Sequence, residues 1–473
     1  MKDYNMPAIN IQNLNLKFPE APVKLFTDLN IEVEAGEKVL LLGPSGSGKS
    51  TLLNVMGGLI PRAIHTPMKT ESIEIPDNNA YVFQDPDSQF TMPTVAEELA
   101  FILENRNIPK ENMETAMLEA LSQTGLNIPL NLNINNLSGG MKQKLAIASA
   151  LLQDPDTLFL DEPTSMLDDE SASSLWDVIE NIWHNRTVII VEHRVDYIWD
   201  KVDRVILMNN QAQITHDGTP DDVLKNYKHL LNEYGVWHPD SWQEAPVFNP
   251  LPPAEEVLLE IKNLHLERQG MEILHIDNLT VAGGEWITLE GKNGTGKSSL
   301  LLAIMKLIPS AGNIYYRNKK VAKTKQIAGE VYPVFQNPEL QFITHKVFDE
   351  VFINMESRFE YSEAVRQTEV ILQQMGLSNT AHLHPLEIST GQKRRLSVAT
   401  SFGGVPNILL LDEPTFGLDQ KHAFRMLEIF QELTESGTAI IMITHDENIK
   451  TRYPSRRLII EDGMLHEKRI HDA

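Results

Sequence analysis

Two stretches of this sequence have the residue types that hold a chain of phosphates. They are Gly43-Pro44-Ser45-Gly46-Ser47-Gly48-Lys49-Ser50 and Gly291-Lys292-Asn293-Gly294-Thr295-Gly296-Lys297-Ser298. Each follows an apolar run and precedes a helical pattern, which is the setting that such a loop requires. Glycines let backbone N–H groups surround a phosphate at a helix N-terminus, the lysine contacts the terminal phosphates, and the serine ligates Mg²⁺. The stretches therefore predict two sites for ATP and Mg²⁺, with nucleotide contacts extending to Thr51 and Ser299.

Paired carboxylates follow each loop at nearly the same distance. The apolar run Leu158-Phe-Leu ends in Asp161-Glu162-Pro163, and Leu409-Leu-Leu ends in Asp412-Glu413-Pro414. Alone, such a run is typical of a strand entering a turn, but its recurrence after two phosphate loops indicates a site. Ligands of an open α/β sheet bind at the carboxyl ends of the strands. We therefore expect the aspartates to hold Mg²⁺ and the glutamates to act as general bases toward the attacking water.

The motifs recur in the same order about 250 residues later, a period that indicates duplicated domains rather than a solenoid. Between the copies lies a proline-rich stretch, residues 237–253, whose prolines forbid helix and favour an extended, semi-rigid spacer. We place one domain at residues 1–236, a linker at 237–256 and a second domain at 257–473. Short β-branched runs, such as 187–191 and 439–443, alternate with helical patterns and predict mainly parallel α/β sheets.

Composition excludes several classes of protein. The 473 residues contain 41 Lys plus Arg against 65 Asp plus Glu, a formal charge of −24, which argues against general affinity for nucleic acid. Cysteine is absent from the sequence, which excludes disulfides and thiolate metal sites. The sequence has neither a signal-peptide core nor an apolar run long enough to span a bilayer. We expect a cytoplasmic protein that needs a partner for any membrane role.

A second potential anion site lies in each copy, where a helical run begins. Leu137-Ser138-Gly139-Gly140-Met141 and Ile388-Ser389-Thr390-Gly391-Gln392 occupy corresponding places. A serine N-cap with glycine in the first turn presents free N–H groups and the positive end of the helix dipole. The same pattern is typical of an ordinary capped helix, and here the order of the motifs favours the anion site.

Taken together, the motifs resemble two fused ATP-binding cassette (ABC) ATPases over nearly the whole chain. The resemblance implies two P-loop NTPase domains, each with a RecA-like parallel-sheet core. Helical patterns at about residues 94–137 and 347–377 predict a mostly helical subdomain inserted into each core. The resemblance also implies a head-to-tail pair, in which the phosphate loop of one copy meets the Ser-Gly-Gly signature of the other, so that one chain holds two composite sites. The resemblance assigns further roles as follows: adenine stacking to Phe18; signature contacts to Ser138, Gly139, Gly140, Ser389, Thr390, Gly391 and Gln392; γ-phosphate contacts to His193 and His445; crossing loops to Asp168 and Asp419; and magnesium-proximal glutamines to Gln84 and Gln336.

The segments around the two glutamines, here called the glutamine loops, are residues 83–90 and 335–342. They share Phe-Gln-Asx-Pro-x-x-Gln-Phe and are similar to those of energy-coupling factor (ECF) importer ATPases. That resemblance implies a peripheral position at the cytoplasmic face of the membrane, a transmembrane coupling protein with an essential arginine, and a substrate-binding membrane protein. Candidate acidic receivers of the arginine are Asp85, Asp87, Glu97 and Glu98 in the first copy and Glu339, Asp349 and Glu350 in the second. A vitamin or vitamin precursor of thiamine type is the first expectation for the substrate, and cobalt or nickel the second.

The two copies differ at the signature. Thr390 replaces a glycine in the second copy, whereas the first keeps both glycines but has Met141 after them and Met166 in its crossing loop. We therefore expect the site built from Lys297, Glu413 and Ser138 to turn over faster than the site built from Lys49, Glu162 and Ser389. Phe18 also has Arg268 as its counterpart, and an arginine plane can likewise stack on a base.

Three other functions compete with this expectation. A soluble tandem cassette protein acting on ribosomes or nucleic acid would typically carry a long, basic linker and lack these glutamine loops. The tandem ATPase of a sugar importer usually has one degraded catalytic set, whereas both sets here are nearly complete. A purely structural role is disfavoured because both Asp-Glu pairs are retained.

Overall fold

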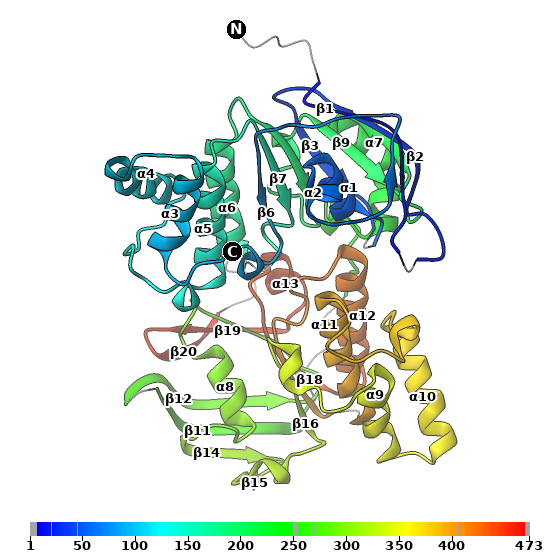
Figure 1. Cartoon of the computed structure of the whole chain (residues 1–473). Helices are drawn as coiled ribbons and strands as arrows, with labels where there is room; N and C mark the ends of the chain where they lie inside the picture. Colours follow the sequence, from blue (N-terminus) through cyan, green and yellow to red (C-terminus); the bar gives the residue numbers. More distant parts are fainter. Residues whose placement is uncertain are drawn as a thin grey trace. The chain divides into compact units, whose positions relative to one another are not determined.

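The computed structural model describes residues 7–19, 21–44, 46–165, 167, 169–248, 254–268, 270–404 and 406–468. The chain divides into two compact units, residues 1–243 with 419–421, and residues 244–418 with 422–473 (Figure 1). The domain bounds given above remain a proposal. One expectation for the linker is wrong, because Ser241–Gln243 forms a 3-10 turn. Proline is absent between Pro239 and Pro246, so nothing there prevents a single turn.

The core of the first unit is a six-stranded sheet with the strand order β10-β9-β3-β8-β7-β6. Its strands are β3 (Lys38–Leu42), β6 (Asn79–Val82), β7 (Thr157–Asp161), β8 (Thr187–Val191), β9 (Arg204–Met208) and β10 (Ile214–Gly218). All neighbours are parallel except β9 and β10. The parallel strands are almost entirely buried, which is why they are continuous apolar runs rather than alternating ones.

A smaller antiparallel sheet forms a separate layer of the first unit. It consists of β1 (Ile9–Leu16), β2 (Phe26–Val33), β4 (Met68–Lys69) and β5 (Ser72–Glu74). Helix α1 (Lys49–Met56) belongs to the apolar core that joins the two layers, where Leu52 and Met56 cluster with Phe26 and Phe159. The helix that follows the phosphate loop is therefore held between two sheets.

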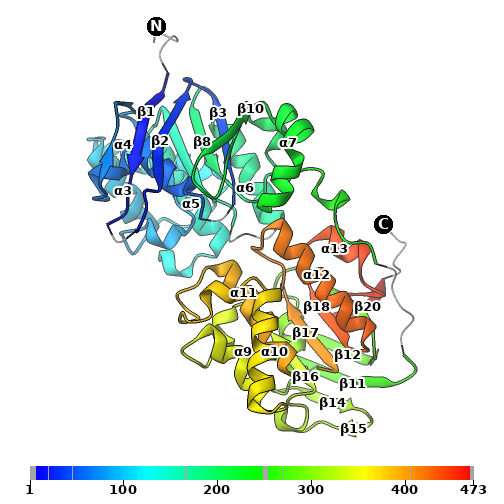
Figure 2. The ribbon, with the colours of Figure 1, turned by 90° about the vertical axis from the view of Figure 1, so that its right-hand side faces the viewer.

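The remaining helices of the first unit are α2 (Leu59–Arg62), α3 (Val95–Asn105), α4 (Lys110–Gln123), α5 (Gly139–Leu152), α6 (Asp169–Ile182) and α7 (Pro220–Tyr234). Figure 2 shows α3 and α4 at one end of the unit, and α7 with the edge strand β10 at the other. Val95, Leu99 and Leu121 pack with Leu145 in a core of their own. The helical subdomain expected at residues 94–137 is thus present and rests on α5.

The second unit has one ten-stranded sheet with the strand order β15-β14-β11-β12-β20-β19-β13-β18-β17-β16. The strands are β11 (Val257–Arg268), β12 (Met271–Ala282), β13 (Trp286–Glu290), β14 (Ala311–Tyr316), β15 (Lys319–Lys320), β16 (Val331–Val334), β17 (Ile408–Asp412), β18 (Ala439–Ile443), β19 (Arg456–Glu461) and β20 (Met464–Lys468). Its antiparallel and parallel parts meet where His275 pairs with Met464, and the His275 N–H donates to Gly463 O at 2.7 Å. The described strands of the first unit, in contrast, form two separate sheets.

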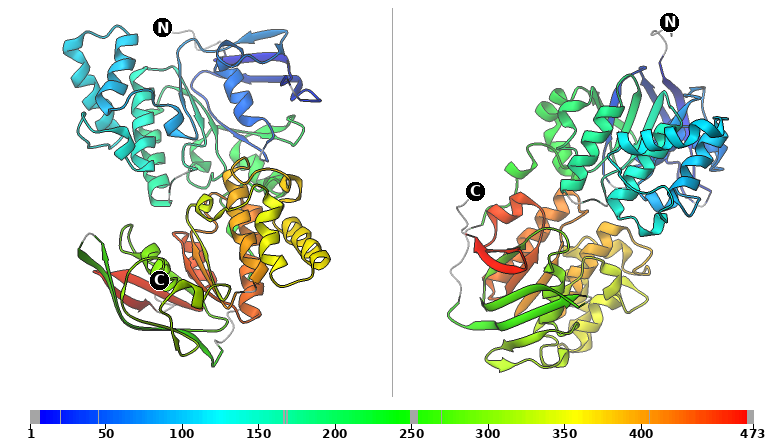
Figure 3. Two further views of the ribbon diagram at one scale, coloured as in Figure 1. Left: turned by 60° about the horizontal axis from the view of Figure 1, so that its bottom comes forward. Right: turned by 90° about the vertical axis from the view of Figure 1, so that its left-hand side faces the viewer.

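The helices of the second unit are α8 (Lys297–Ile304), α9 (Val347–Glu356), α10 (Tyr361–Gln374), α11 (Thr390–Ala399), α12 (Gln420–Glu435) and α13 (Glu447–Arg452). Helices α9 and α10 lie side by side and apart from the β11–β12 hairpin (Figure 3). They form the helical subdomain expected at residues 347–377. Within the described residues, none of the helices combines the length and apolar character that crossing a bilayer requires.

Candidate nucleotide sites

Both phosphate loops connect a core strand to the helix that follows it. The first runs from the end of β3 to α1 and the second from the end of β13 to α8. Gly48 and Gly296 cap these helices with φ of 89° and 99°, a region that favours glycine. A Cβ on Gly43 would lie 2.4 Å from Met208 O, and one on Gly291 would lie 2.7 Å from Ile460 O. The start of each loop therefore passes directly against the neighbouring strand, β9 or β19. Ser45 lies outside the described residues.

The loop lysines fold back over the loops that carry them. Lys49 Nζ donates to Gly43 O at 2.8 Å and to Pro44 O at 2.9 Å. Lys297 Nζ does the same, to Gly291 O at 2.6 Å and Lys292 O at 3.0 Å. Burial lowers the pKa of Lys49 to about 8, although the charges of Glu162 and Asp161 oppose this shift. A phosphate chain in the loop would supply the anionic partner that this buried ammonium group favours.

Of the residues expected to hold Mg²⁺, the serine and the aspartate of each unit are in contact. Ser50 Oγ donates to Asp161 Oδ1 at 2.9 Å. Burial raises the pKa of Asp161 to about 6, and the hydrogen bond from Ser50 partly opposes this. In the second unit burial likewise raises the pKa of Asp412, against a hydrogen bond from Ser298. A hydroxyl and a carboxylate at this spacing are the hard oxygen ligands that Mg²⁺ prefers, so both pairs fit that ion.

The two expected general bases follow their aspartates in an unusual backbone conformation. Glu162 and Glu413 have φ of 49° and 52°, which is rare for residues other than glycine and is found mostly at functional sites. Their N–H groups donate to Val191 O at 2.8 Å and to Ile443 O at 3.0 Å. Each glutamate is therefore fixed to the adjacent strand at the carboxyl edge of the sheet.

In the first unit three predicted site residues, Glu162, His193 and Gln84, are in contact. His193 Nε2 lies 3.0 Å from Glu162 Oε1, and Gln84 Nε2 donates to Glu162 Oε2 at 2.7 Å. Burial alone would raise the pKa of Glu162, but the hydrogen bond and charge of His193, with Lys49, hold it below its usual value. In the second unit His445 Nε2 lies 3.6 Å from Glu413 Oε1. The ionised form of Glu162, the predicted base, is thus favoured, and the side chain of Gln84, the predicted magnesium-proximal glutamine, contacts this carboxylate.

A buried acid behind the first site was missed by the sequence interpretation. Glu192 accepts hydrogen bonds from Thr164 Oγ1 at 2.7 Å and from the His193 N–H at 2.9 Å. Burial raises the pKa of Glu192 to about 7, and the negative charge of Glu162 adds to the shift. The corresponding residue of the second copy is Thr444. An acidic residue directly after the apolar run 187–191 was the available signal.

The signature segments, residues 138–140 and 389–391, begin helices α5 and α11. Ser138 Oγ accepts the Met141 N–H, and Ser389 Oγ accepts the Gln392 N–H, both at 3.3 Å. Gln392 Oε1 also accepts the Ser389 N–H at 2.9 Å, which completes a capping box. Each serine and the residue after it are exposed. Both helix N-termini are therefore open to an anion.

The other predicted contacts are distributed as follows. Phe18 follows β1 with 38% exposure, and its counterpart Arg268 ends β11. Thr51 and Ser299 lie in the first turns of α1 and α8. Asp419 directly precedes α12, whereas Asp168 and Met166 lie outside the described residues. The assignment of these residues to ATP remains a proposal.

Asp161→Asn is expected to stabilise the nucleotide-free protein at pH 7.5 by ~1–3 kcal/mol. The pKa of Asp161 in the folded protein, about 6, lies above its ordinary value. Ionisation of this buried acid therefore destabilises the folded protein, and asparagine, which does not ionise, avoids this loss. The loss is complete above pH 6 and disappears as the pH falls toward 4. Calorimetric melting should therefore show a gain at pH 7.5 that narrows at pH 5, while Mg²⁺-dependent ATP binding weakens. A gain that does not change with pH would contradict this account.

Comparisons with known proteins support this interpretation. The family model described as "ABC transporter" matches residues 26–165 and 274–416. "Putative HMP/thiamine import ATP-binding protein YkoD" of Bacillus subtilis is 34% identical, over 97% of this chain and 90% of its own length. A "Putative ABC transporter ATP-binding protein" of Streptococcus mutans is 32% identical, over 97% of this chain and 90% of its own length.

Among solved structures, the archaeal ribosome recycling factor aABCE1, in complex with the stalk protein aP1, superimposes with a TM-score of 0.64. It is 19% identical and covers 93% of this chain and 86% of its own, a level of identity that shows a shared fold alone. Each of the two family matches spans one phosphate loop and one Asp-Glu pair. The chain belongs to the ABC transporter family, as an ATPase with two ATP-binding domains.

Proposed function

We propose that this ATPase energises an ECF-type importer, hydrolysing Mg²⁺-bound ATP to drive uptake of a vitamin or vitamin precursor through membrane partner subunits. A thiamine-type compound is the first candidate, supported by the name of the Bacillus subtilis relative, which refers to HMP/thiamine import. A transition-metal ion such as cobalt or nickel is the second. The two composite ATP sites implied by the family, and the peripheral position at the cytoplasmic face, belong to the same proposal.

The observation that carries the proposal is the attachment of both glutamine loops to the signature helices. Lys142 Nζ on α5 lies 2.6 Å from Asp87 Oδ1, and Lys393 Nζ on α11 lies 2.6 Å from Glu339 Oε1. A buried side chain one residue further along each helix, Gln143 or Arg394, holds the loop backbone. The two units thus repeat one connection between the catalytic edge and an exposed turn.

Gln143 and Arg394 provide this second attachment in the two units. Gln143 Nε2 donates to Gln84 O at 3.2 Å, and Arg394 Nη1 donates to Gln336 O at 2.6 Å. In the first unit the side chain of the same Gln84 contacts Glu162. If a membrane partner displaced the glutamine loop of the first unit, Gln84 would transmit the movement directly to Glu162, the proposed general base.

The acidic candidates for a partner's arginine divide into two groups. Glu98 and Glu350 are buried, and each accepts two backbone N–H groups from the segment after its glutamine loop, so they position that segment. Asp87 and Glu339 are paired with lysines, and Asp85 caps its own turn. Glu97 and Asp349 are the corresponding residues in the first turns of α3 and α9. Glu97 Oε2 accepts the Thr94 hydroxyl at 2.6 Å, but neither residue belongs to the two lysine pairs, so we assign the arginine to them.

The two loops offer different surfaces to a partner. Leu340 and Ile343 of the second unit are each 75% exposed, whereas Ser88 and Thr91, also exposed, take their places in the first. An exposed leucine and isoleucine beside a glutamine loop suit the apolar face of a short helix. We therefore assign the stronger apolar contact with the membrane subunit to the second unit.

Leu340→Ser combined with Ile343→Ser is expected to reduce recovery of membrane partners at least about tenfold, because burial of two such side chains contributes roughly 3 kcal/mol. The full chain, tagged and expressed in its native host, would be captured from detergent-solubilised membranes and its companions identified by mass spectrometry. Ser88→Ala combined with Thr91→Ala is the matched control and should retain the partners. Equal recovery by both double variants would refute the assignment of the contact to the second unit.

The same capture tests the proposed function as a whole. Integral membrane proteins recovered with the wild-type chain would support the importer. Ribosomal proteins in their place would overturn it and favour the alternative of a tandem cassette protein acting on ribosomes. The structural likeness to a ribosome recycling factor concerns the fold alone and does not decide between the two.

A further inference from the structure

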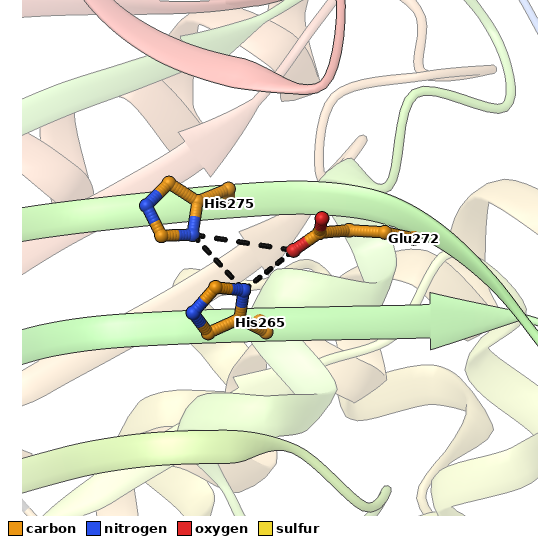
Figure 4. A group of neighbouring side chains, drawn as sticks. All are labelled: His265, Glu272 and His275. Carbon is orange, nitrogen blue, oxygen red and sulfur yellow. Dashed lines mark hydrogen bonds and ion pairs between the residues drawn. The ribbon is translucent and has the colours of Figure 1, made fainter.

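Two histidines and a glutamate converge on the β11–β12 hairpin of the second unit. His265, Glu272 and His275 place one ligand atom each within 4.8 Å of one another (Figure 4). His265 Nδ1 lies 2.5 Å from Glu272 Oε1 and 3.1 Å from His275 Nδ1, and Oε1 lies 4.0 Å from His275 Nδ1. Among the residues that the structure describes, this is the one such group of three.

The backbone explains why these side chains meet. His265 and His275 face each other directly in the antiparallel ladder, and so their rings lie on one face of the sheet. Strict alternation would place Glu272 on the opposite face from His275. The ladder instead pairs Leu266 with Leu274 and Glu267 with Glu272, so that Ile273 is an extra, bulged residue. The bulge turns Glu272 toward the histidines, as bulges beside functional sites commonly do.

A fourth residue orients one of the rings. His275 Nε2 lies 2.8 Å from Asp277 Oδ1, which suits an N–H donating to the carboxylate. The other nitrogen, Nδ1, then points its lone pair at the cluster. Histidine ligands of metal ions typically donate their second nitrogen in this way, because the bond fixes the tautomer and the ring orientation. The arrangement is therefore that of a ligand with its supporting carboxylate.

The corresponding place in the first unit is occupied differently. Asn15 lies between Leu14 and Leu16 as His265 lies between Leu264 and Leu266. Asn15 Nδ2 donates to Asp28 Oδ1, and Lys24 Nζ donates to Asn15 Oδ1, both at 2.8 Å. An amide and an ammonium group there offer no imidazole ligand, and the lysine already supplies a positive charge. The first hairpin is thus an internal comparison for the second.

We propose that His265, Glu272 and His275 bind a divalent transition-metal ion, with Zn²⁺ the foremost candidate. Tetrahedral zinc with bonds near 2.0 Å requires neighbouring ligand atoms about 3.3 Å apart, and the three observed separations lie on both sides of that value. Imidazole nitrogens favour Zn²⁺, Ni²⁺ and Cu²⁺ over Mg²⁺. The side chains of Glu272 and His275 are 52% and 23% exposed, so an ion can enter and a water molecule can complete its coordination.

The test uses the full chain without a polyhistidine tag, stripped of metal and nucleotide and kept in excess Mg²⁺. Zn²⁺ would be titrated in competition with a chromogenic chelator. The wild type should bind one tight equivalent that His265→Gln combined with His275→Gln loses. Glu272→Gln should weaken it at least about tenfold, and Asp277→Asn, which removes only the supporting carboxylate, about 10–100-fold. Bound Co²⁺ should give a ligand-field absorption spectrum, and the variants should lose this absorption in the same order in which they lose Zn²⁺ binding.

A second pair of histidines provides the matched control. The rings of His345 and His384 lie 5.6 Å apart, but the pair belongs to no group of three ligand residues in the described part of the chain. Their double change to glutamine should leave the tight equivalent intact. Retention of that equivalent by the His265/His275 double variant, or its loss from the His345/His384 variant, would overturn the assignment. The Asp277→Asn result decides the question if the His265/His275 variant does not fold.

Discussion

Glu413→Gln is expected to lower the ATPase rate of the assembled complex to that of its slower site, whereas Glu162→Gln should leave most of the activity. A general base contributes about 10²–10⁴-fold at the site that it serves. In the proposed composite sites, Glu413 works with Lys297 and the intact signature of Ser138, and Glu162 works with the signature that contains Thr390. The double variant should lose activity by the full factor. Glutamine preserves the shape of the side chain, so the loss reports proton transfer rather than folding.

The two glutamates differ in their recorded contacts. Gln84 Nε2 donates to one carboxylate oxygen of Glu162 at 2.7 Å, and His193 Nε2 lies 3.0 Å from the other. His445 Nε2 lies 3.6 Å from Glu413 Oε1. Steady-state phosphate release by the complex in membranes or detergent measures the effect. A larger loss from Glu162→Gln than from Glu413→Gln would reverse the assignment.

Gly43→Ala should destabilise the nucleotide-free first unit by about 3 kcal/mol or more, because its Cβ would lie 2.4 Å from a carbonyl oxygen of β9. Gly46→Ala is the matched control in the same loop. Its Cβ would meet nothing within 4 Å, and only the φ of 81° adds strain, about 1–2 kcal/mol. The backbone oxygen of Met208 cannot move without breaking the sheet, so the loop itself must shift.

Differential scanning calorimetry without nucleotide distinguishes the two alanine variants. Each kcal/mol of lost stability lowers the melting temperature of a unit of this size by about 2–4 °C. The second unit repeats the comparison with Gly291, whose Cβ would lie 2.7 Å from Ile460 O, and Gly294, whose Cβ would meet nothing. Gly291→Ala should again melt well below Gly294→Ala. Equal melting temperatures within both pairs would mean that the loop can withdraw from the neighbouring strand at little cost.

The sequence was sufficient to predict the fold class and the order of the catalytic elements. Continuous apolar runs such as 187–191 became buried parallel strands, and the contacts of Ser50 with Asp161 and of Glu162 with His193 join residues that motif order already grouped. These features depend on local pattern and on strand ends that share one edge. The roles of the site residues in binding ATP remain predictions.

Other features depend on packing between distant segments, and no local pattern encodes them. Lys142 pairs with Asp87, 55 residues away, so the candidates for a partner's arginine could not be sorted from the sequence. The convergence of His265 and His275 needs both the strand register and the bulge at Ile273. The role of Glu192 could not be predicted because the sequence does not show that the residue after the strand is still buried.

The pairing of His275 with Met464 makes the two units differ in how their sheets are connected. In the second unit a backbone hydrogen bond joins the antiparallel strands to the core sheet, so a push on the hairpin that ends in Arg268 is carried straight into the strands bearing the catalytic edge. In the described strands of the first unit the two layers form separate sheets, joined by side-chain packing and by a hydrogen bond from Arg204 Nη1 on β9 to Glu32 O on β2 at 3.0 Å. A displacement of this hairpin should therefore reach the core sheet more directly in the second unit than in the first, a difference that two identical subunits could not have.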